Sequence, residues 1–168
     1  MYKSIFIALF ICCSFFSFSI EAKNQQPKKY FTKQEVILLE KQLIILINEE
    51  RAKYGLKGLK EWELLSEVSK EHSTNMAEGT VDFGHNGFDN RAKKIQCQPN
   101  ISSVGENVAY LYGYNDYLKE AVKGWMESPG HRKNILGDYK LTGMGIAFSK
   151  NGRCYLTQLF ANMRKTSK

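Results

Sequence analysis

The hydrophobic and polar positions divide the chain into an apolar N-terminal run and a longer part of mixed pattern. Residues 5–20 are almost entirely apolar, follow one early lysine (Lys3) and precede a polar segment. This order is typical of a secretory signal peptide, and the run is short for a membrane span of about 20 residues. We predict a signal peptide over residues 1–22, cleaved after Ala22. An uncleaved N-terminal anchor and lipid attachment at Cys12 or Cys13 are the alternatives.

Helical periodicity dominates the middle of the chain. Residues 23–34 are polar and form a predicted tether to the domain. Thr32 and Glu35 form a capping box, which predicts a helix that runs to about Tyr54 and stops at Gly55. Apolar positions at helical spacing predict three further helices, over residues 63–78, 89–95 and 117–127. Pro129 prevents the last of these from continuing.

The C-terminal part changes to a strand pattern. Residues 142–148 and 155–160 are predicted strands, joined by a hairpin turn at Asn151-Gly152. Gly143 and Gly145 are expected to allow a close approach of a neighbouring element. Residues 101–103 are expected to form a loop that opens onto Gly105. Helices early and strands late predict a single α+β domain with helices covering a sheet.

Charge and cysteine content narrow the function classes. The chain carries 24 Lys and Arg against 17 Asp and Glu, for a net charge of +7. The lysines are scattered without a dense block, so nucleic acid is not an expected partner. Two cysteines, Cys97 and Cys154, remain after the signal peptide. They are a candidate disulfide for an exported protein, with two separate buried thiols as the alternative. The chain has no Cys-x-x-Cys, which argues against a structural zinc knuckle.

Candidate chemistry is concentrated in three polar, glycine-containing segments. These are Gly84-His85-Asn86, Gly105-Glu106-Asn107 and Ser128-Pro129-Gly130-His131. Each carries a side chain that can bind a metal or a proton. We expect three loops that converge on one polar site.

These segments belong to a longer ordered set of motifs. The set is Asn48-Glu49-Glu50-Arg51-Ala52-Lys53-Tyr54-Gly55-Leu56, His72-Ser73 with Met76-Ala77, Gly84-His85, Gly105-Glu106-Asn107-Val108-Ala109, Trp125-Met126 with Ser128-Pro129-Gly130-His131-Arg132 and Asn134-Ile135-Leu136, Gly143 with Gly145, and Thr157-Gln158 with Phe160. In this order they resemble the CAP superfamily of cysteine-rich secretory, antigen 5 and pathogenesis-related proteins, also called SCP domains. The resemblance is greatest to the compact bacterial branch. It covers about residues 38–162.

The resemblance implies a three-layer α-β-α sandwich with a central, mostly antiparallel sheet, over residues 35–164. It also implies a polar cavity lined by His85, Glu106, Ser128 and His131. Many animal members have Glu where Ser128 stands. Glu127 is adjacent but points about 100° away on a helix, so we do not expect it to substitute. The cavity therefore lacks a second carboxylate.

These residues favour binding over catalysis. His85 and His131 can ligate zinc or another divalent metal, and two protein ligands predict weak binding. His72 is expected to pack near the core or to hydrogen-bond a neighbouring loop, with a third ligand position as the alternative. In a tyrosine-rich segment around Gly113, alternate members are expected to line the core, and contact with a glycan, a lipid or a protein is the alternative: Tyr110, Tyr112, Tyr114 and Tyr117.

We expect a monomeric, secreted or surface-displayed binding module whose partner is a lipid, a glycan or a protein. Membrane attachment through the N-terminus remains open. The alternatives are a metal-assisted peptidase or esterase of the cell envelope, and a purely structural module.

Overall fold

The structure of the protein is a computed structural model, in which residues 31–164 are described. It consists of α1 (Lys33–Lys53), β1 (Lys60–Glu61), α2 (Glu63–Glu78), α3 (Phe88–Gln96), β2 (Ile101–Leu111), α4 (Tyr117–Glu127), α5 (Pro129–Ile135), β3 (Leu141–Phe148) and β4 (Cys154–Met163). The predicted signal peptide, its cleavage site and the tether up to residue 30 lie outside this range.

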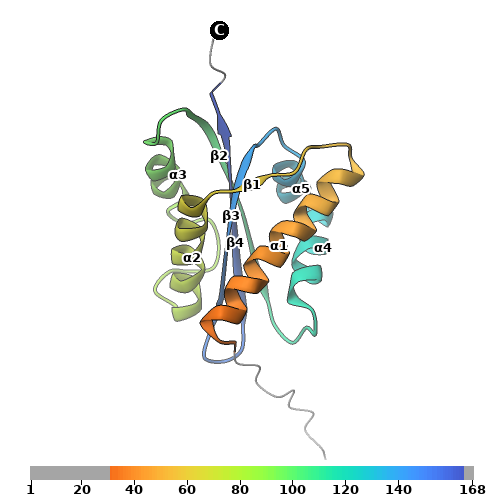
Figure 1. Cartoon of the computed structure of the whole chain (residues 1–168). Coiled ribbons are helices and arrows are strands. Elements are labelled where there is room, and N and C mark those ends of the chain that lie inside the picture. Colours follow the sequence, from red (N-terminus) through yellow and green to blue (C-terminus); the bar gives the residue numbers. More distant parts are fainter. Residues whose placement is uncertain (1–30, 165–168) are drawn as a thin grey trace, which may run out of the picture.

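A four-stranded sheet lies between two helical layers (Figure 1). Helices α2 and α3 cover one face, where α2 packs on β3 and β4 and α3 packs on β2. Helices α1, α4 and α5 cover the other face, where α1 contacts β3 and both α4 and α5 contact β2. The predicted α+β sandwich is confirmed.

The strand order is β1-β3-β4-β2, which makes β2 an edge strand. β4 pairs antiparallel with both β2 and β3, and only the two-residue β1 pairs parallel, with β3. The prediction of a mostly antiparallel sheet is therefore confirmed. The loop predicted at residues 101–103 is wrong, because β2 begins at Ile101. The strand was not recognised because β2 contains polar residues, two of which, Glu106 and Asn107, are buried against partners distant in sequence.

The long helices form where local signals predict them. The Thr32–Glu35 capping box is present, and Gly79 ends α2 in the left-handed conformation. Helix α4 ends before Ser128, as predicted. Helix α5, which begins at Pro129, was not predicted from the sequence. Proline cannot continue α4, because it lacks the N–H that a helix interior needs. The first residue of a helix needs no such N–H and has a φ close to the fixed value of proline, so Pro129 is well suited to begin α5.

The domain extends slightly beyond its predicted start. Residues 31–34 were assigned to the tether, but Lys33 and Gln34 belong to α1. The Phe31 ring stacks on Phe148 of β3 at a centroid distance of 4.5 Å. The chain therefore enters the fold at the end of the sheet that carries the β3–β4 hairpin.

The candidate disulfide between Cys97 and Cys154 does not form. Both are free cysteines, with Cys97 exposed and Cys154 buried. Cys154 pairs with Leu111 at one end of β2, whereas Cys97 lies four residues before the other end, at Ile101. Ten residues of extended strand span about 33 Å, and a disulfide needs Cα atoms closer than about 7 Å. The alternative of two separate thiols holds, although only Cys154 is buried.

Candidate functional site

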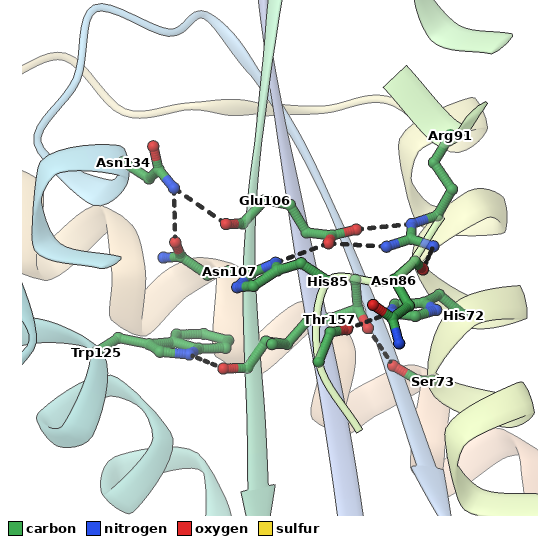
Figure 2. A network of polar contacts seen from close by, with 12 residues as sticks. His72, Ser73, His85, Asn86, Arg91, Glu106, Asn107, Trp125, Asn134 and Thr157 are labelled. Carbon is green, nitrogen blue, oxygen red and sulfur yellow. Dashed lines mark hydrogen bonds and ion pairs between the residues drawn. The ribbon is translucent and has the colours of Figure 1, made fainter. Parts of the chain in front are cut away.

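Glu106 lies at the centre of a polar network on β2 (Figure 2). Its side chain is only 1% exposed. Arg91 of α3 donates two hydrogen bonds to the carboxylate, from Nε to Oε2 at 2.7 Å and from Nη2 to Oε1 at 2.8 Å. The same guanidinium donates from Nη1 to the Asn86 carbonyl at 2.9 Å. The buried charge of Glu106 is thus compensated by a bidentate arginine.

His85 lies on the loop between α2 and α3, and its Nδ1 is 2.9 Å from Glu106 Oε1. A carboxylate held by arginine only accepts, so Nδ1 carries the hydrogen and donates. In the neutral ring the lone pair then lies on Nε2, on a side chain that is 50% exposed. A carboxylate that orients a histidine in this way is a common arrangement around metal ligands.

His72 of α2 holds the His85 loop in place. Its Nε2 lies 2.9 Å from the carbonyl oxygen of Gly84. Because a carbonyl only accepts, His72 Nε2–H is the donor. Burial, as the main cause, lowers the pKa of His72 and favours the neutral ring. The expected bond to a neighbouring loop is confirmed, and His72 acts on the site through Gly84.

His131 approaches from the other side of β2, on α5. Its ring centroid lies 6.1 Å from that of His85, with the rings tilted by 39°. Burial lowers the pKa of His131, and the neighbouring His85 lowers it further. The Asn107 side chain donates to the His131 carbonyl at 3.1 Å. This bond fixes the helix that carries His131 to the strand that carries Glu106.

The free edge of β2 is covered by side chains from the same layer. Asn134 Nδ2 donates to the Glu106 carbonyl at 3.0 Å and to Asn107 Oδ1 at 2.9 Å. Trp125 Nε1 donates to the Val108 carbonyl at 3.0 Å. The carbonyls of Glu106 and Val108 have no neighbouring strand on the free side of β2. Trp125 and Asn134 therefore saturate the edge and attach α4 and α5 to it.

Ser128 lies at the junction of α4 and α5, half-buried and three residues before His131. Within residues 31–164 its hydroxyl makes no hydrogen bond, although its carbonyl accepts from Arg132 N at 2.8 Å. Glu127 is exposed and lines a separate hollow with Met126 and Arg132. The structure thus joins His85, Glu106 and His131, and a role of Ser128 stays a prediction.

The described residues offer two imidazoles to a metal. No group of three or more His, Cys, Asp or Glu between Phe31 and Arg164 is arranged to hold an ion. Glu106 has both oxygens engaged by Arg91 and His85. The His85 and His131 ring centroids lie 6.1 Å apart, and imidazole nitrogen is a common zinc ligand. The donor set fits a divalent ion bound by two ligands plus water.

The role of Arg91 was not predicted from the sequence. A single basic residue in a short helix attracts no notice, and only the fold places it against Glu106. The available signal was chemical: a glutamate with Val104 and Val108 two residues to either side, on the same face of a strand, implies a cationic partner. Asn134 was within the motif set, but its bond to the sheet edge required β2 to be recognised as a strand.

A sandwich in which His85 and His131 meet over Glu106 at the sheet edge is the arrangement expected from the resemblance of the motifs. The profile of the cysteine-rich secretory protein family, CAP, matches residues 44–160. The chain belongs to this family.

Two curated relatives come from Bacillus subtilis. The chain is 36% identical over 126 residues to the uncharacterised membrane protein YlbC, covering 72% of this chain and 34% of YlbC. It is 32% identical over 127 residues to the uncharacterised protein YkwD, covering 71% of this chain and 46% of YkwD. The chain thus spans less than half the length of both relatives.

Solved structures share the fold. An outer surface protein of Borrelia burgdorferi is 20% identical with a TM-score of 0.62, covering 82% of this chain and 99% of that chain. An extracellular SCP-domain protein of Bacillus anthracis is 23% identical with a TM-score of 0.60, covering 82% of this chain and 45% of that chain. None of the helices within residues 31–164 combines the length and apolar character that a bilayer span needs.

Proposed function

We propose that this chain is an exported binding module whose His85–His131 pair holds a divalent cation, such as zinc, weakly and reversibly. The observation that carries the proposal is the hydrogen bond from His85 Nδ1 to Glu106. It fixes the tautomer that leaves Nε2 as a lone pair, on the imidazole that lies 6.1 Å from His131. Burial also favours the neutral, metal-binding form of His131.

The binding is weak because the site supplies two ligands. Tight zinc sites in proteins use three or four ligands. Glu106 acts behind the ligands, where it orients His85. An ion at this position is therefore exchangeable, and water completes its coordination.

A metal-assisted hydrolase is the alternative from another class. When bound, a metal would supply Lewis acidity and an activated water. Such an enzyme also needs a base, and Glu106 is buried with both oxygens in hydrogen bonds to Arg91. Ser128 makes no side-chain hydrogen bond to His131 in the described part of the chain, so a serine–histidine pair is not formed. These contacts favour binding over catalysis. A purely structural module is the third possibility.

The partner of the module is a lipid, a glycan or a protein, and the module acts as a monomer outside the cell or on its surface. The apolar run at residues 5–20 supports export. The names of similar proteins support the same location, since they include an outer surface protein and an extracellular protein.

Calorimetric titration with zinc tests the metal site. We expect weak binding by the native chain and none by a His85→Ala, His131→Ala double variant. His72→Gln is the matched control, because it keeps an N–H donor for Gly84 and changes no ligand. Identical titrations of native chain and double variant would leave only a metal-free role. Ser128→Ala measures whether Ser128 contributes.

Hydrolysis is tested separately. Peptide and ester libraries are incubated with the folded chain, with and without added zinc. We expect no turnover. Turnover that requires zinc and disappears in the double variant would establish the hydrolase alternative.

A further inference from the structure

A strip of exposed aromatic side chains leads away from the polar site. Phe83, Tyr110 and Tyr112 are 51%, 40% and 62% exposed. The Phe83 centroid lies 5.9 Å from that of Tyr110 and 6.4 Å from that of the buried Tyr155. The Tyr110 and Tyr155 centroids are 5.5 Å apart. We call Phe83, Tyr110, Tyr112 and Tyr155 the aromatic strip.

The strip follows one face of β2 and therefore continues from the site. Successive even-numbered residues of a strand lie on the same face, so Glu106, Val108 and Tyr110 line up. Tyr155 is the cross-strand partner of Tyr110 on β4. Phe83 precedes His85 by two residues. At the far end, a Cβ placed on Gly152 would lie 3.9 Å from the Tyr112 ring. The strip thus connects the His85 loop with the β3–β4 hairpin.

Arg153 supplies a positive charge in the middle of the strip. Its guanidinium carbon lies 5.6 Å from the Tyr110 ring centroid. Across residues 31–164, no carboxylate lies within ion-pair distance of Arg153. A guanidinium over a tyrosine ring can still bind a carboxylate bidentately through its N–H groups.

We infer that the aromatic strip binds an oligosaccharide that carries a carboxylate, with the sugar faces on the rings and the carboxylate on Arg153. The inference rests on the proposed role as a binding module and gives its ligand class. The C–H face of a sugar ring packs flat on an aromatic face, which buries apolar area while tyrosine hydroxyls meet the sugar hydroxyls. The net charge of +7 favours an acidic chain.

The shape of the strip favours a saccharide over a lipid tail. Phe83, Tyr110 and Tyr112 are exposed and Tyr155 is buried, and the hydroxyls of the two exposed tyrosines keep this surface partly polar. A lipid tail requires an enclosed apolar groove to remove its methylenes from water. The Phe83, Tyr110 and Tyr155 centroids lie 5.5–6.4 Å from one another, so these rings form a compact platform that suits the flat face of a sugar ring.

Binding is tested with two tetrasaccharides of equal length, on the purified full chain. Hyaluronan tetrasaccharide contains carboxylates, and chitotetraose is neutral. We expect hyaluronan tetrasaccharide to bind more tightly, and Arg153→Gln to weaken it about two- to fivefold without changing chitotetraose binding. Phe83→Ala and Tyr112→Ala should each weaken both ligands about three- to tenfold.

The matched control is Tyr54→Ala. Tyr54 is also an exposed tyrosine with an arginine over its ring, Arg132 at 5.5 Å, but it lies at the end of α1 in the other helical layer. We expect this variant to bind both tetrasaccharides like the native chain. Loss of affinity equal to that of Tyr112→Ala would overturn the inference, as would the absence of saccharide binding by the native chain.

The same variants separate this inference from the proposed metal site. Zinc titration should be unchanged in Tyr112→Ala and Arg153→Gln. Saccharide binding should persist in the His85→Ala, His131→Ala variant, so each site can fail without the other. Sedimentation with phosphatidylglycerol vesicles tests the competing possibility that the aromatic strip contacts a membrane. Vesicle binding that falls in Tyr112→Ala, without saccharide binding, would identify the strip as a membrane contact and overturn the inference.

Discussion

Arg91 holds Glu106 by two parallel hydrogen bonds of 2.7 and 2.8 Å, across a sequence separation of 15 residues. The glutamate side chain is 1% exposed and that of the arginine 14%. A buried carboxylate that loses its partner keeps its desolvation cost without compensation. The pair therefore fixes α3 to the sheet and, through Glu106, orients His85.

Arg91→Ala should lower the free energy of unfolding by about 3–5 kcal/mol, because it leaves Glu106 buried and unpaired. Urea denaturation measures the change. The control is Lys94→Ala on the same helix, where the pair with Glu71 is 3.6 Å long and exposed on both sides. We expect a change below about 1 kcal/mol there. Equal effects of the two substitutions would contradict the role assigned to Arg91.

Helix α2 packs directly on the backbone of β3 at two glycines. A Cβ on Gly143 would collide with backbone atoms of Leu65 and Ser66, and one on Gly145 with those of Ser69 and Lys70. The expected close approach at these glycines is confirmed. Neither contact can be relieved by rotating a side chain, because both partners are backbone.

Gly145→Ala should therefore destabilise the fold by several kcal/mol or prevent folding. Gly124→Ala is the matched control, since a Cβ there meets nothing within 4 Å and the residue lies in α4. We expect this control to stabilise the protein by roughly 0.5–1 kcal/mol. Thermal melting followed by circular dichroism measures both. A melting temperature of Gly145→Ala close to native would show that α2 can move away from the sheet.

The sequence predicted elements whose signals are local and missed those that depend on partners. The Thr32–Glu35 box and Gly79 act within one helical turn, so α1 and α2 were found with their ends. β2 was missed because Glu106 and Asn107 are polar. Their burial depends on Arg91 and Asn134, 15 and 27 residues away.

The resemblance of motifs identified the site residues, but it did not predict the contacts that they make. His85, Glu106 and His131 were correctly expected to converge. The carboxylate was expected on a loop, and instead lies in a strand whose free edge is saturated by Trp125 and Asn134. Such contacts connect separate elements and have no periodic signature in the sequence.

Acidification should weaken the fold through His72. Burial lowers its folded pKa below the ordinary 6.5, so the unfolded state binds more protons as the pH falls through this range. The stability is fully present above pH 6.5 and is lost as the pH falls from 6.5 toward the folded pKa. Glu40 opposes this at lower pH, because burial raises its pKa above 4.5.

Urea denaturation between pH 7.5 and 5, with chelator present, measures this dependence. His72→Gln should show a smaller loss of stability across the range, since glutamine can donate to Gly84 without titrating. His131 retains its own lowered pKa, so part of the slope should remain. The same slope in both proteins would show that His72 does not titrate in the unfolding equilibrium.

The two cysteines beyond the predicted signal peptide should react at very different rates. Cys97 is exposed at the end of α3, whereas Cys154 is buried in β4, where burial raises the pKa of its thiol. Thiolate is the reactive form, so both access and ionisation protect Cys154. In the processed chain, a chromogenic disulfide reagent should label Cys97 rapidly and Cys154 only after unfolding. Cys97→Ser should abolish labelling of the native protein and leave the melting temperature unchanged. If neither thiol reacts before reduction, both cysteines are oxidised. Because Cys97 and Cys154 lie at opposite ends of β2, each would then be bonded to another molecule.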